Sequence, residues 1–225
     1  MAMLSGPRLP AARGQATHLV VLCHGYGADG NDLIGLAPHW QRLMPTAAFV
    51  APNAPEPCAA GPGYQWFPIS RLDPHLMRQG VERAAATLEA FLDAELARAK
   101  LSEDRLALVG FSQGTMMSLH VGLKRKPAAI VGYSGLLADV PAERYPDAPP
   151  VLLVHGDADP MIPAEYLFAS SAALGRAGVP VQWHLSPDTA HAIDASGLAL
   201  GGLFLSLAFR GLLKPKDPDI SCVIQ

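Results

Sequence analysis

A serine between two glycines is the residue in this chain best suited to act as a nucleophile. The segment Gly110-Phe111-Ser112-Gln113-Gly114 follows an apolar run, 105–109, that predicts a strand, and it opens a helical pattern. A G-x-S-x-G sequence between a strand and a helix is typical of a sharp turn that exposes a catalytic hydroxyl. The helix N-terminus favours negative charge at that point. We therefore expect Ser112 to attack an acyl carbon; a plain helix-capping serine is the alternative.

A serine hydroxyl needs a base and an orienting acid, and both residue types follow Ser112 in the chain. The segment 155–160, His-Gly-Asp-Ala-Asp-Pro, comes after a predicted strand, and His191 comes after the last predicted strand. The order Ser, Asp, His is one that such catalytic triads adopt. His191 is the expected base. Asp157 and Asp159 are alternative acids, and the other of the two is expected to form a turn.

Other serine and histidine residues fit this chemistry less well. The segment Gly132-Tyr133-Ser134-Gly135 has Leu136 where the second glycine of the motif should stand. His24 and His155 each precede a glycine at a strand end, but neither has a second ligand at the spacing of a zinc site. We expect no metal here, and we expect these two histidines to hold loop backbone through side-chain hydrogen bonds.

Acyl transfer also needs hydrogen-bond donors for the oxyanion that develops on the acyl group. Gln113, directly after the candidate nucleophile, supplies one backbone N–H. A second is expected from Tyr26 in the loop His24-Gly25-Tyr26-Gly27, which follows the first predicted strand. The glycines on both sides of Tyr26 let this backbone approach a substrate.

The same loop permits a different interpretation, because Gly25 to Gly30 also has the G-x-G-x-x-G spacing of a dinucleotide-binding turn. That turn needs an acidic residue about 20 positions further on, at the end of the second strand. The second predicted strand instead runs into Val-Ala-Pro-Asn-Ala-Pro, 50–55, and the next acidic residue is Glu56. Nucleotide binding would also leave the Ser, Asp and His positions unexplained, so we disfavour it.

Short apolar runs that end in glycine or proline predict buried strands of a mainly parallel sheet. They are 18–23, 47–51, 105–109, 128–133, 151–154 and 181–185. Helical patterns are found at 74–100, 113–125, 164–177 and 192–212. This alternation predicts an α/β fold with right-handed crossovers and helices on both faces of the sheet.

We expect residues 1–225 to form a single domain, because no repeat or long linker interrupts this order. Residues 1–16 are expected to be a loose N-terminal arm, and 214–225 a frayed tail. The segment 52–68, rich in Pro, Gly and Ala, is expected to form an irregular excursion near one sheet edge. The last four residues, Cys222 to Gln225, match a prenylation motif, but such short matches are common by chance and we prefer the frayed tail.

Composition excludes several classes of protein. With 17 Lys and Arg against 20 Asp and Glu, the formal net charge is -3, without the basic excess that nucleic-acid binding needs. Apolar residues make up 50% of the chain, yet no run approaches the roughly 20 residues of a membrane helix, so we expect no stable membrane insertion. Three cysteines at unrelated spacings predict neither disulfides nor a zinc ribbon and fit a reducing cytoplasm.

In their order along the chain, these motifs resemble the phospholipase/carboxylesterase family of α/β hydrolases, which includes acyl-protein thioesterases. The matching segments cover most of the chain and are 24–27 with 30–33, 51–55, 66–67, 110–114, 155–157 with 159–160, and 191. The resemblance implies an α/β-hydrolase fold. It also implies the nucleophile Ser112, the acid Asp159, the base His191, and oxyanion donors in the amides of Tyr26 and Gln113. It favours Asp159 over Asp157, a choice that the residues themselves leave open.

Several apolar residues near these motifs are expected to line a groove for the acyl chain, with ordinary core packing as the alternative. They are Trp66, Phe67, Met161 and Ile162. The linkers are too short for a large lid domain. Family members commonly carry an Asp after Trp-Phe, whereas this chain has Pro68, which leaves the substrate preference open.

The expected function is hydrolysis of carboxylic esters with short to medium acyl chains, with thioesters or lysophospholipids as further substrates. The reaction would pass through an acyl-serine intermediate and need no cofactor. The substrate would be a small-molecule or lipid-like ester rather than a nucleic acid. A non-catalytic scaffold that only binds ligands is the alternative class, and the oligomeric state is open, a homodimer included.

Overall fold

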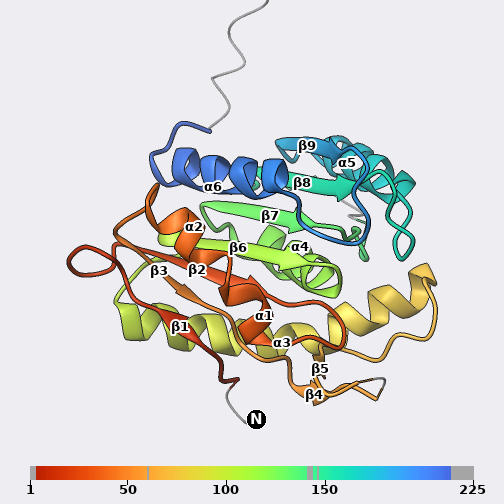
Figure 1. Cartoon of the computed structure of the whole chain (residues 1–225), viewed down its shortest axis with the longest axis horizontal. Helices are drawn as coiled ribbons and strands as arrows, with labels where there is room; N and C mark the ends of the chain where they lie inside the picture. The colour runs from red at the N-terminus through yellow and green to blue at the C-terminus, as the bar shows by residue number, and fades with distance from the viewer. Residues whose placement is uncertain (1–3, 60, 141–143, 146, 214–225) are drawn as a thin grey trace, which may run out of the picture.

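A seven-stranded sheet forms the centre of the computed structural model, which describes residues 4–59, 61–140, 144–145 and 147–213 (Figure 1). In spatial order its strands are β1 (Arg8–Leu9), β3 (Ala47–Val50), β2 (His18–Cys23), β6 (Leu106–Phe111), β7 (Ala129–Tyr133), β8 (Val151–Gly156) and β9 (Val181–Ser186). All neighbours run parallel except β1, which is antiparallel to β3. Every predicted strand is confirmed, and the chain has the mostly parallel α/β fold that the sequence predicts.

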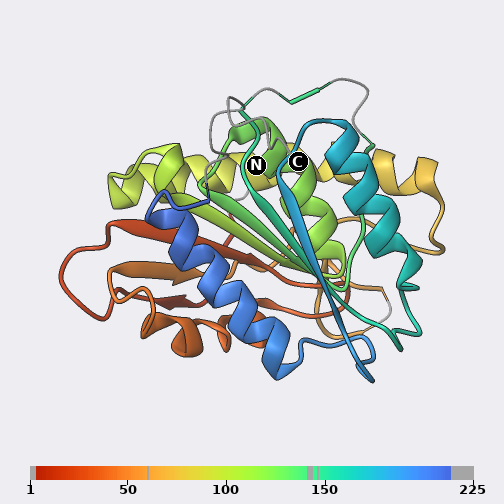
Figure 2. The ribbon, with the colours of Figure 1, turned by 90° about the horizontal axis from the view of Figure 1, so that it is seen from above.

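Helices cover both faces of this sheet (Figure 2). One face carries α3 (Pro74–Ala99), α4 (Gln113–Arg125) and α5 (Glu165–Arg176), and the other carries α1 (Gly30–Ile34), α2 (Ala37–Gln41) and α6 (Ala195–Phe209). A 3-10 turn, Glu103–Arg105, leads into β6. All the predicted helices are confirmed. The short helices α1 and α2 are absent from the prediction because five residues cannot display a helical repeat.

The residues of β2 alternate between the two faces of the sheet. Leu19, Val21 and Cys23 pack with α3 and α4, whereas Val20 and Leu22 pack with α1, α2 and α6. Burial on both faces explains why the run is apolar without interruption. Because the central strands are parallel, their carboxyl ends meet at one edge of the sheet, where the connecting loops can carry function.

Strand β1 and its neighbours are held against the sheet, which corrects the expectation of a loose arm for this part of 1–16, whereas residues 12–15 are exposed and lie outside any strand. Strand β1 pairs with β3, and Arg8 forms an ion pair with the buried carboxylate of Glu95 in α3. A two-residue edge strand leaves little signal in a sequence, because its stability comes from a distant partner. The expected tail, 214–225, and its motif at Cys222 lie outside the described residues.

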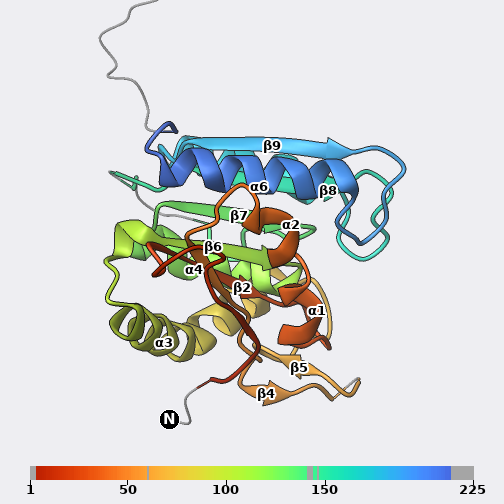
Figure 3. The same cartoon turned by 60° about the vertical axis from the view of Figure 1, so that its left-hand side comes forward.

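The segment 52–68 is more regular than expected. It contains an antiparallel hairpin of β4 (Glu56–Pro57) and β5 (Tyr64–Gln65), seen at the bottom of the molecule in Figures 1 and 3. A bridge between Ala28 and Tyr64 joins this hairpin to the loop after β2. Along the described ranges, no helical domain is inserted as a lid. Within these ranges, every helix is too short or too polar to cross a membrane.

Candidate active site

Ser112 lies in a tight turn between β6 and α4, at the carboxyl edge of the sheet. Its backbone has φ 52° and ψ -115°, a conformation that residues other than glycine rarely adopt. Both glycines of the motif are required because a Cβ at either position would clash with neighbouring backbone. A Cβ on Gly110 would lie 2.3 Å from the Gly114 carbonyl oxygen, and one on Gly114 would lie 1.8 Å from the Cys23 carbonyl oxygen. The spacing of the motif therefore reflects close packing of β6, α4 and β2 around a partly exposed serine.

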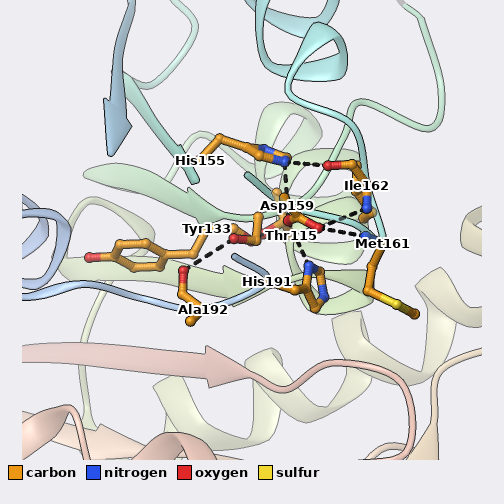
Figure 4. Close-up of polar contacts among 9 residues, drawn as sticks. Thr115, Tyr133, His155, Asp159, Met161, Ile162, His191 and Ala192 are labelled. Carbon is orange, nitrogen blue, oxygen red and sulfur yellow. Dashed lines mark hydrogen bonds and ion pairs between the residues drawn. The ribbon is translucent and has the colours of Figure 1, made fainter. Parts of the chain in front are cut away.

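Asp159, in the loop after β8, makes the contacts expected of the acid (Figure 4). One carboxylate oxygen, Oδ1, accepts hydrogen bonds from the Met161 and Ile162 amides at 2.8 and 2.9 Å. The other oxygen, Oδ2, accepts a hydrogen bond from Nδ1 of His191 at 2.7 Å. The carboxylate is fully buried, so these donors replace the water that it loses.

Asp157 makes no such contact with the imidazole within the described part of the chain. It is exposed, and its carboxylate accepts a long hydrogen bond of 3.4 Å from the Thr189 amide. This bond links the loop after β8 to the loop after β9. The structure therefore brings together His191 and Asp159, and it leaves Asp157 at the surface.

His191 lies beside the turn that carries Ser112. The centre of its ring is 4.9 Å from that of Phe111, the residue before Ser112, and its side chain is 21% exposed. Because Nδ1 donates to Asp159, Nε2 is the nitrogen that can accept a proton. Among the described contacts no hydrogen bond joins Nε2 to Ser112 Oγ. Catalytic hydrogen bonds are often long until a substrate is bound.

His155 holds loop backbone, as predicted. It is 1% exposed, and its Nε2 donates to the Ile162 carbonyl oxygen at 2.8 Å. The same nitrogen lies 3.3 Å from Oδ2 of Asp159, and this contact is drawn in Figure 4. His155 thus supports the loop from which Asp159 reaches His191.

His24 also holds loop backbone, as predicted. Its Nε2 accepts a hydrogen bond from the Ala54 amide at 2.9 Å, and its Nδ1 donates to the Gly25 carbonyl oxygen at 2.7 Å. Burial lowers the pKa of His24, which favours the neutral imidazole that these two bonds require. The loop that His24 holds is the one expected to supply an oxyanion donor.

That loop touches the turn of the candidate nucleophile. A Cβ on Gly25 would lie 3.3 Å from the Cβ of Ser112. Within the described residues, the backbone N–H groups of Tyr26 and Gln113 have no hydrogen-bond acceptor. Unpaired amides beside a serine at a helix N-terminus are suited to bind a developing negative charge.

The glycine spacing in the same loop does not form a nucleotide site. It leads into α1, and the first amides of that helix are already used. Asp29 accepts hydrogen bonds from the Asn31 and Asp32 amides at 2.7 and 3.3 Å. A bound pyrophosphate would need these donors and would meet a carboxylate in their place. The geometry therefore gives no support to dinucleotide binding.

The residues expected to line a groove differ in exposure. Trp66, Phe67 and Ile162 are 1%, 0% and 3% exposed and belong to the hydrophobic core, which favours the alternative of core packing for these three. The Phe67 ring fills the space above Gly80 of α3, where a Cβ would lie 2.2 Å from it. Met161, by contrast, is 65% exposed.

Hollows along the described residues include a small apolar one and a larger one. An apolar cavity of about 190 Å³ lies between the start of α3, the loop after β7 and α5, with Leu72, Met77, Leu136 and Tyr166 in its lining. A larger hollow of about 740 Å³ lies at the amino ends of the strands, on the opposite edge from Ser112. The lining of the smaller cavity includes Leu136, directly after Gly135, where a Cβ would lie 2.8 Å from the Ser112 carbonyl oxygen.

The Gln113 side chain has a role that the sequence does not predict. It is 0% exposed, and its carboxamide accepts a hydrogen bond from the Trp66 amide and donates one to the Phe67 carbonyl oxygen. Its partners are more than 40 residues away in the chain, so no local pattern marks the contact. The available hint is a polar residue that begins a largely buried helix.

Comparisons with known proteins identify similar chains. A family model described as Phospholipase/Carboxylesterase matches residues 5–207. The chain is 30% identical to Esterase YpfH of Escherichia coli (strain K12), with 80% of this chain and 78% of that protein covered. It is also 30% identical to Acyl-protein thioesterase 1 of Gibberella zeae, with 94% and 97% covered. The crystal structure of esterase PE8 matches with a TM-score of 0.84 and 40% identity, covering 91% of this chain and 98% of the other.

Proposed function

We propose, from the premise that this chain belongs to the phospholipase/carboxylesterase family, that Ser112, His191 and Asp159 form the catalytic triad of a serine esterase. The family and the similar proteins named esterase and acyl-protein thioesterase make the chain a carboxylesterase-like hydrolase of esters or thioesters. The proposal adds the residues and the acyl-serine intermediate. The observation that carries it is the 2.7 Å hydrogen bond between His191 and Asp159, beside the strained turn of Ser112.

In the first half of the reaction, Ser112 Oγ attacks the acyl carbon while Nε2 of His191 accepts the hydroxyl proton. The new bond joins Oγ to carbon, and the carbonyl electrons move onto oxygen. Asp159 fixes the tautomer of the imidazole and stabilises the imidazolium that forms. His191 then gives the proton to the leaving alcohol or thiol as the bond to the acyl carbon breaks.

In the second half, water replaces the leaving group. His191 takes a proton from water, the resulting hydroxide attacks the acyl-serine, and Ser112 recovers its proton as the acid product departs. In both tetrahedral intermediates the amides of Tyr26 and Gln113 donate hydrogen bonds to the oxyanion. Their free N–H groups and the contact between Gly25 and Ser112 support this assignment.

We place the acyl chain in the apolar cavity that is walled by the loop after β7. At about 190 Å³ it is smaller than the roughly 300–1,000 Å³ of sites for drug-sized ligands. A cavity of this size favours short to medium acyl chains, and each buried methylene contributes about 0.8 kcal/mol. Met161 is proposed to contact the substrate at the exposed rim.

A cytoplasmic location stays part of the proposal. Cys23 and Cys58 are both free and buried, as expected for a protein of a reducing compartment. Burial raises the pKa of Cys23 to about 12, so its thiol is protonated and inert as a competing nucleophile.

Turnover of p-nitrophenyl butyrate and of a matched butyryl thioester tests the proposal. The wild-type protein should release both leaving groups, and mass spectrometry of quenched samples should detect a butyryl adduct. Ser112→Ala should lose turnover and adduct together while its thermal unfolding is unchanged. Binding of the ester without turnover would instead support a non-catalytic scaffold.

A further inference from the structure

A buried amide side chain ties the candidate nucleophile's turn to the hairpin segment. The carboxamide of Gln113 accepts a hydrogen bond from the Trp66 amide at 2.9 Å and donates one to the Phe67 carbonyl oxygen at 2.7 Å. Gln113 is also the residue whose backbone N–H faces the proposed oxyanion. A residue that is 0% exposed and bonded at both ends of its amide cannot rotate without breaking these bonds.

The side chain of Trp66 continues this connection to the loop after β2. Its indole Nε1 donates a hydrogen bond to the His24 carbonyl oxygen at 3.0 Å, and the ring is 1% exposed. The bond reaches the chain two residues before Tyr26. Residues 24, 66 and 113 come from separate parts of the sequence, and hydrogen bonds join them into one unit.

The Gly25 carbonyl fixes the orientation of the Tyr26 N–H, because both belong to one peptide group. The Ala54 amide donates to Nε2 of His24, so the proton of the neutral imidazole is on Nδ1, which donates to the Gly25 carbonyl oxygen. A peptide bond is planar and trans, so this carbonyl and the Tyr26 N–H point in opposite directions from the same rigid group. Fixing one therefore aims the other.

We propose that the Gln113 carboxamide and the Trp66 indole form a brace that sets the distance and direction between the two oxyanion donors. The proposal rests on the proposed function, because it concerns the amides of Tyr26 and Gln113 at that site. Trp66 and the Gln113 side chain are positioning residues in this account, since neither touches the substrate. Preorganised donors matter because they stabilise charge that appears only in the transition state.

Two buried tryptophans give a matched test. Trp66 and Trp40 are each 1% exposed, and each indole N–H donates to a backbone carbonyl oxygen, of His24 at 3.0 Å and of Leu198 at 2.8 Å. Trp40 lies in α2, apart from the proposed oxyanion donors. Replacement by Phe removes the donor and keeps a large ring in both variants. Their losses of unfolding temperature should therefore be similar.

The kcat and KM for p-nitrophenyl butyrate distinguish a positioning role of Trp66 from a purely structural one. Trp66→Phe should lower kcat by about tenfold or more, a part of the roughly 10²–10³ that a whole oxyanion donor supplies. KM and the pH midpoint of activity should stay at the wild-type values, because ground-state binding and the His191–Asp159 pair are untouched. Trp40→Phe should keep kcat near the wild-type value. Equal kcat for the two variants, or a loss confined to KM, would overturn the brace.

A second variant and a measurement on the wild-type protein keep the test possible if Trp66→Phe folds poorly. Gln113→Met keeps the backbone N–H and removes the carboxamide, so it should reproduce the selective loss of kcat. In wild-type protein the indole N–H resonance of Trp66, but not that of Trp40, should shift when a phosphonate occupies the site; unchanged resonances would contradict the brace. Absence of turnover and labelling in the wild-type protein would reject the proposed function itself, whereas normal labelling with equal variants would reject the brace alone.

Discussion

Two turns at the carboxyl edge of the sheet look alike in backbone and differ in surroundings. Ser112 follows β6 with φ 52°, and Ser134 follows β7 with φ 44°. Each donates its backbone N–H to the neighbouring strand, Ser112 to the Tyr133 carbonyl oxygen at 2.9 Å and Ser134 to that of Val154 at 2.8 Å. The hydroxyl of Ser134 is buried and donates to the Ala192 carbonyl oxygen at 3.3 Å. Ser112 is partly exposed and has no such hydroxyl partner in the described part of the chain.

A strained serine at a strand end is therefore not enough for nucleophilic chemistry. Ser112 is followed at once by α4, whose N-terminus favours an anion, whereas Ser134 is followed by a loop that walls the apolar cavity. Ser134 contributes instead by holding the residue after His191. We infer that the first turn carries the chemistry and that the second supports the base and the acyl chain.

Removing the two hydroxyls gives the largest expected contrast. Ser112→Ala should lower kcat by about 10³–10⁶, because oxyanion binding alone remains. Ser134→Ala removes one hydrogen bond, worth about 0.5–1.5 kcal/mol of stability, and should retain most of the turnover. Steady-state kinetics on p-nitrophenyl butyrate with thermal unfolding of both variants measures the contrast. A larger loss of kcat in Ser134→Ala would reverse the assignment.

The aspartates after β8 form a second pair of like residues with unlike contacts. Asp159→Asn should lower kcat by about 10² or more relative to Asp157→Asn, because Asp159 alone orients His191. Both amides are close in size to the carboxylates they replace, so the folds should be comparable. Equal effects on kcat would show that the His191–Asp159 hydrogen bond is not the functional one.

Lowering the pH should abolish catalysis at Ser112 while the protein, including the turn of Ser134, stays folded. His191 must be neutral to accept the Ser112 proton, so kcat/KM should fall through a single protonation as the pH is lowered. Below the midpoint the loss should be about tenfold per pH unit. A pH–rate profile with circular dichroism at each pH makes this test. A flat profile on a substrate for which chemistry limits the rate would exclude a histidine base.

A larger side chain in the cavity wall tests whether the loop after Ser134 lines the acyl site. Leu136, 6% exposed, lies two residues after Ser134 and borders the cavity. Leu136→Phe should reduce kcat/KM for hexanoyl relative to acetyl p-nitrophenyl esters by several-fold, because about 0.8 kcal/mol is lost for each methylene that is no longer buried. Turnover of the acetyl ester serves as the internal control. An unchanged ratio would place the acyl chain elsewhere.

The smallest expected effect is on stability and concerns Asp194, three residues after His191. Burial alone would raise the pKa of Asp194, but hydrogen bonds from Ser196, Ser186 and Gly197 lower it to about 2. Because this value lies below the ordinary one of about 3.9, the carboxylate stabilises the fold above about pH 4, and this contribution disappears as the pH falls towards about 2.

Asp194 also caps the N-terminus of α6. Asp194→Ala should therefore lower the free energy of unfolding by about 1 kcal/mol at pH 7. Chemical denaturation at pH 7 and pH 2 should show a smaller difference from wild type at the lower pH. An equal difference at both values would contradict the role of the ionised carboxylate.

Local patterns were sufficient for the longer strands, the long helices and the turns that carry Ser112 and His191. Each of these depends on periodicity or on a turn whose residues are adjacent in the chain. The choice between Asp157 and Asp159 could not be made from the residues alone, because both lie in one loop and only the direction of the side chain separates them. Trp66 shows the same limit, because the sequence around an aromatic residue does not reveal whether its side chain faces a groove or the core.

The placement of the N-terminal residues and of the Gln113 side chain depends on contacts across the fold. Strand β1 exists because β3 offers an edge, and the Gln113 carboxamide is buried because the hairpin segment supplies its partners. Neither partner is near in sequence. Such features require the assembled fold before they can be recognised.

Mass spectrometry of the fluorophosphonate adduct tests the central claim most directly. A fluorophosphonate reacts with an activated serine, so the adduct marks whichever hydroxyl the molecule makes nucleophilic. Peptide mapping should find the phosphonate on Ser112, and labelling should disappear in Ser112→Ala and persist in Ser134→Ala. An adduct on Ser134, or labelling that survives in Ser112→Ala, would contradict the assignment of the chemistry to the turn between β6 and α4.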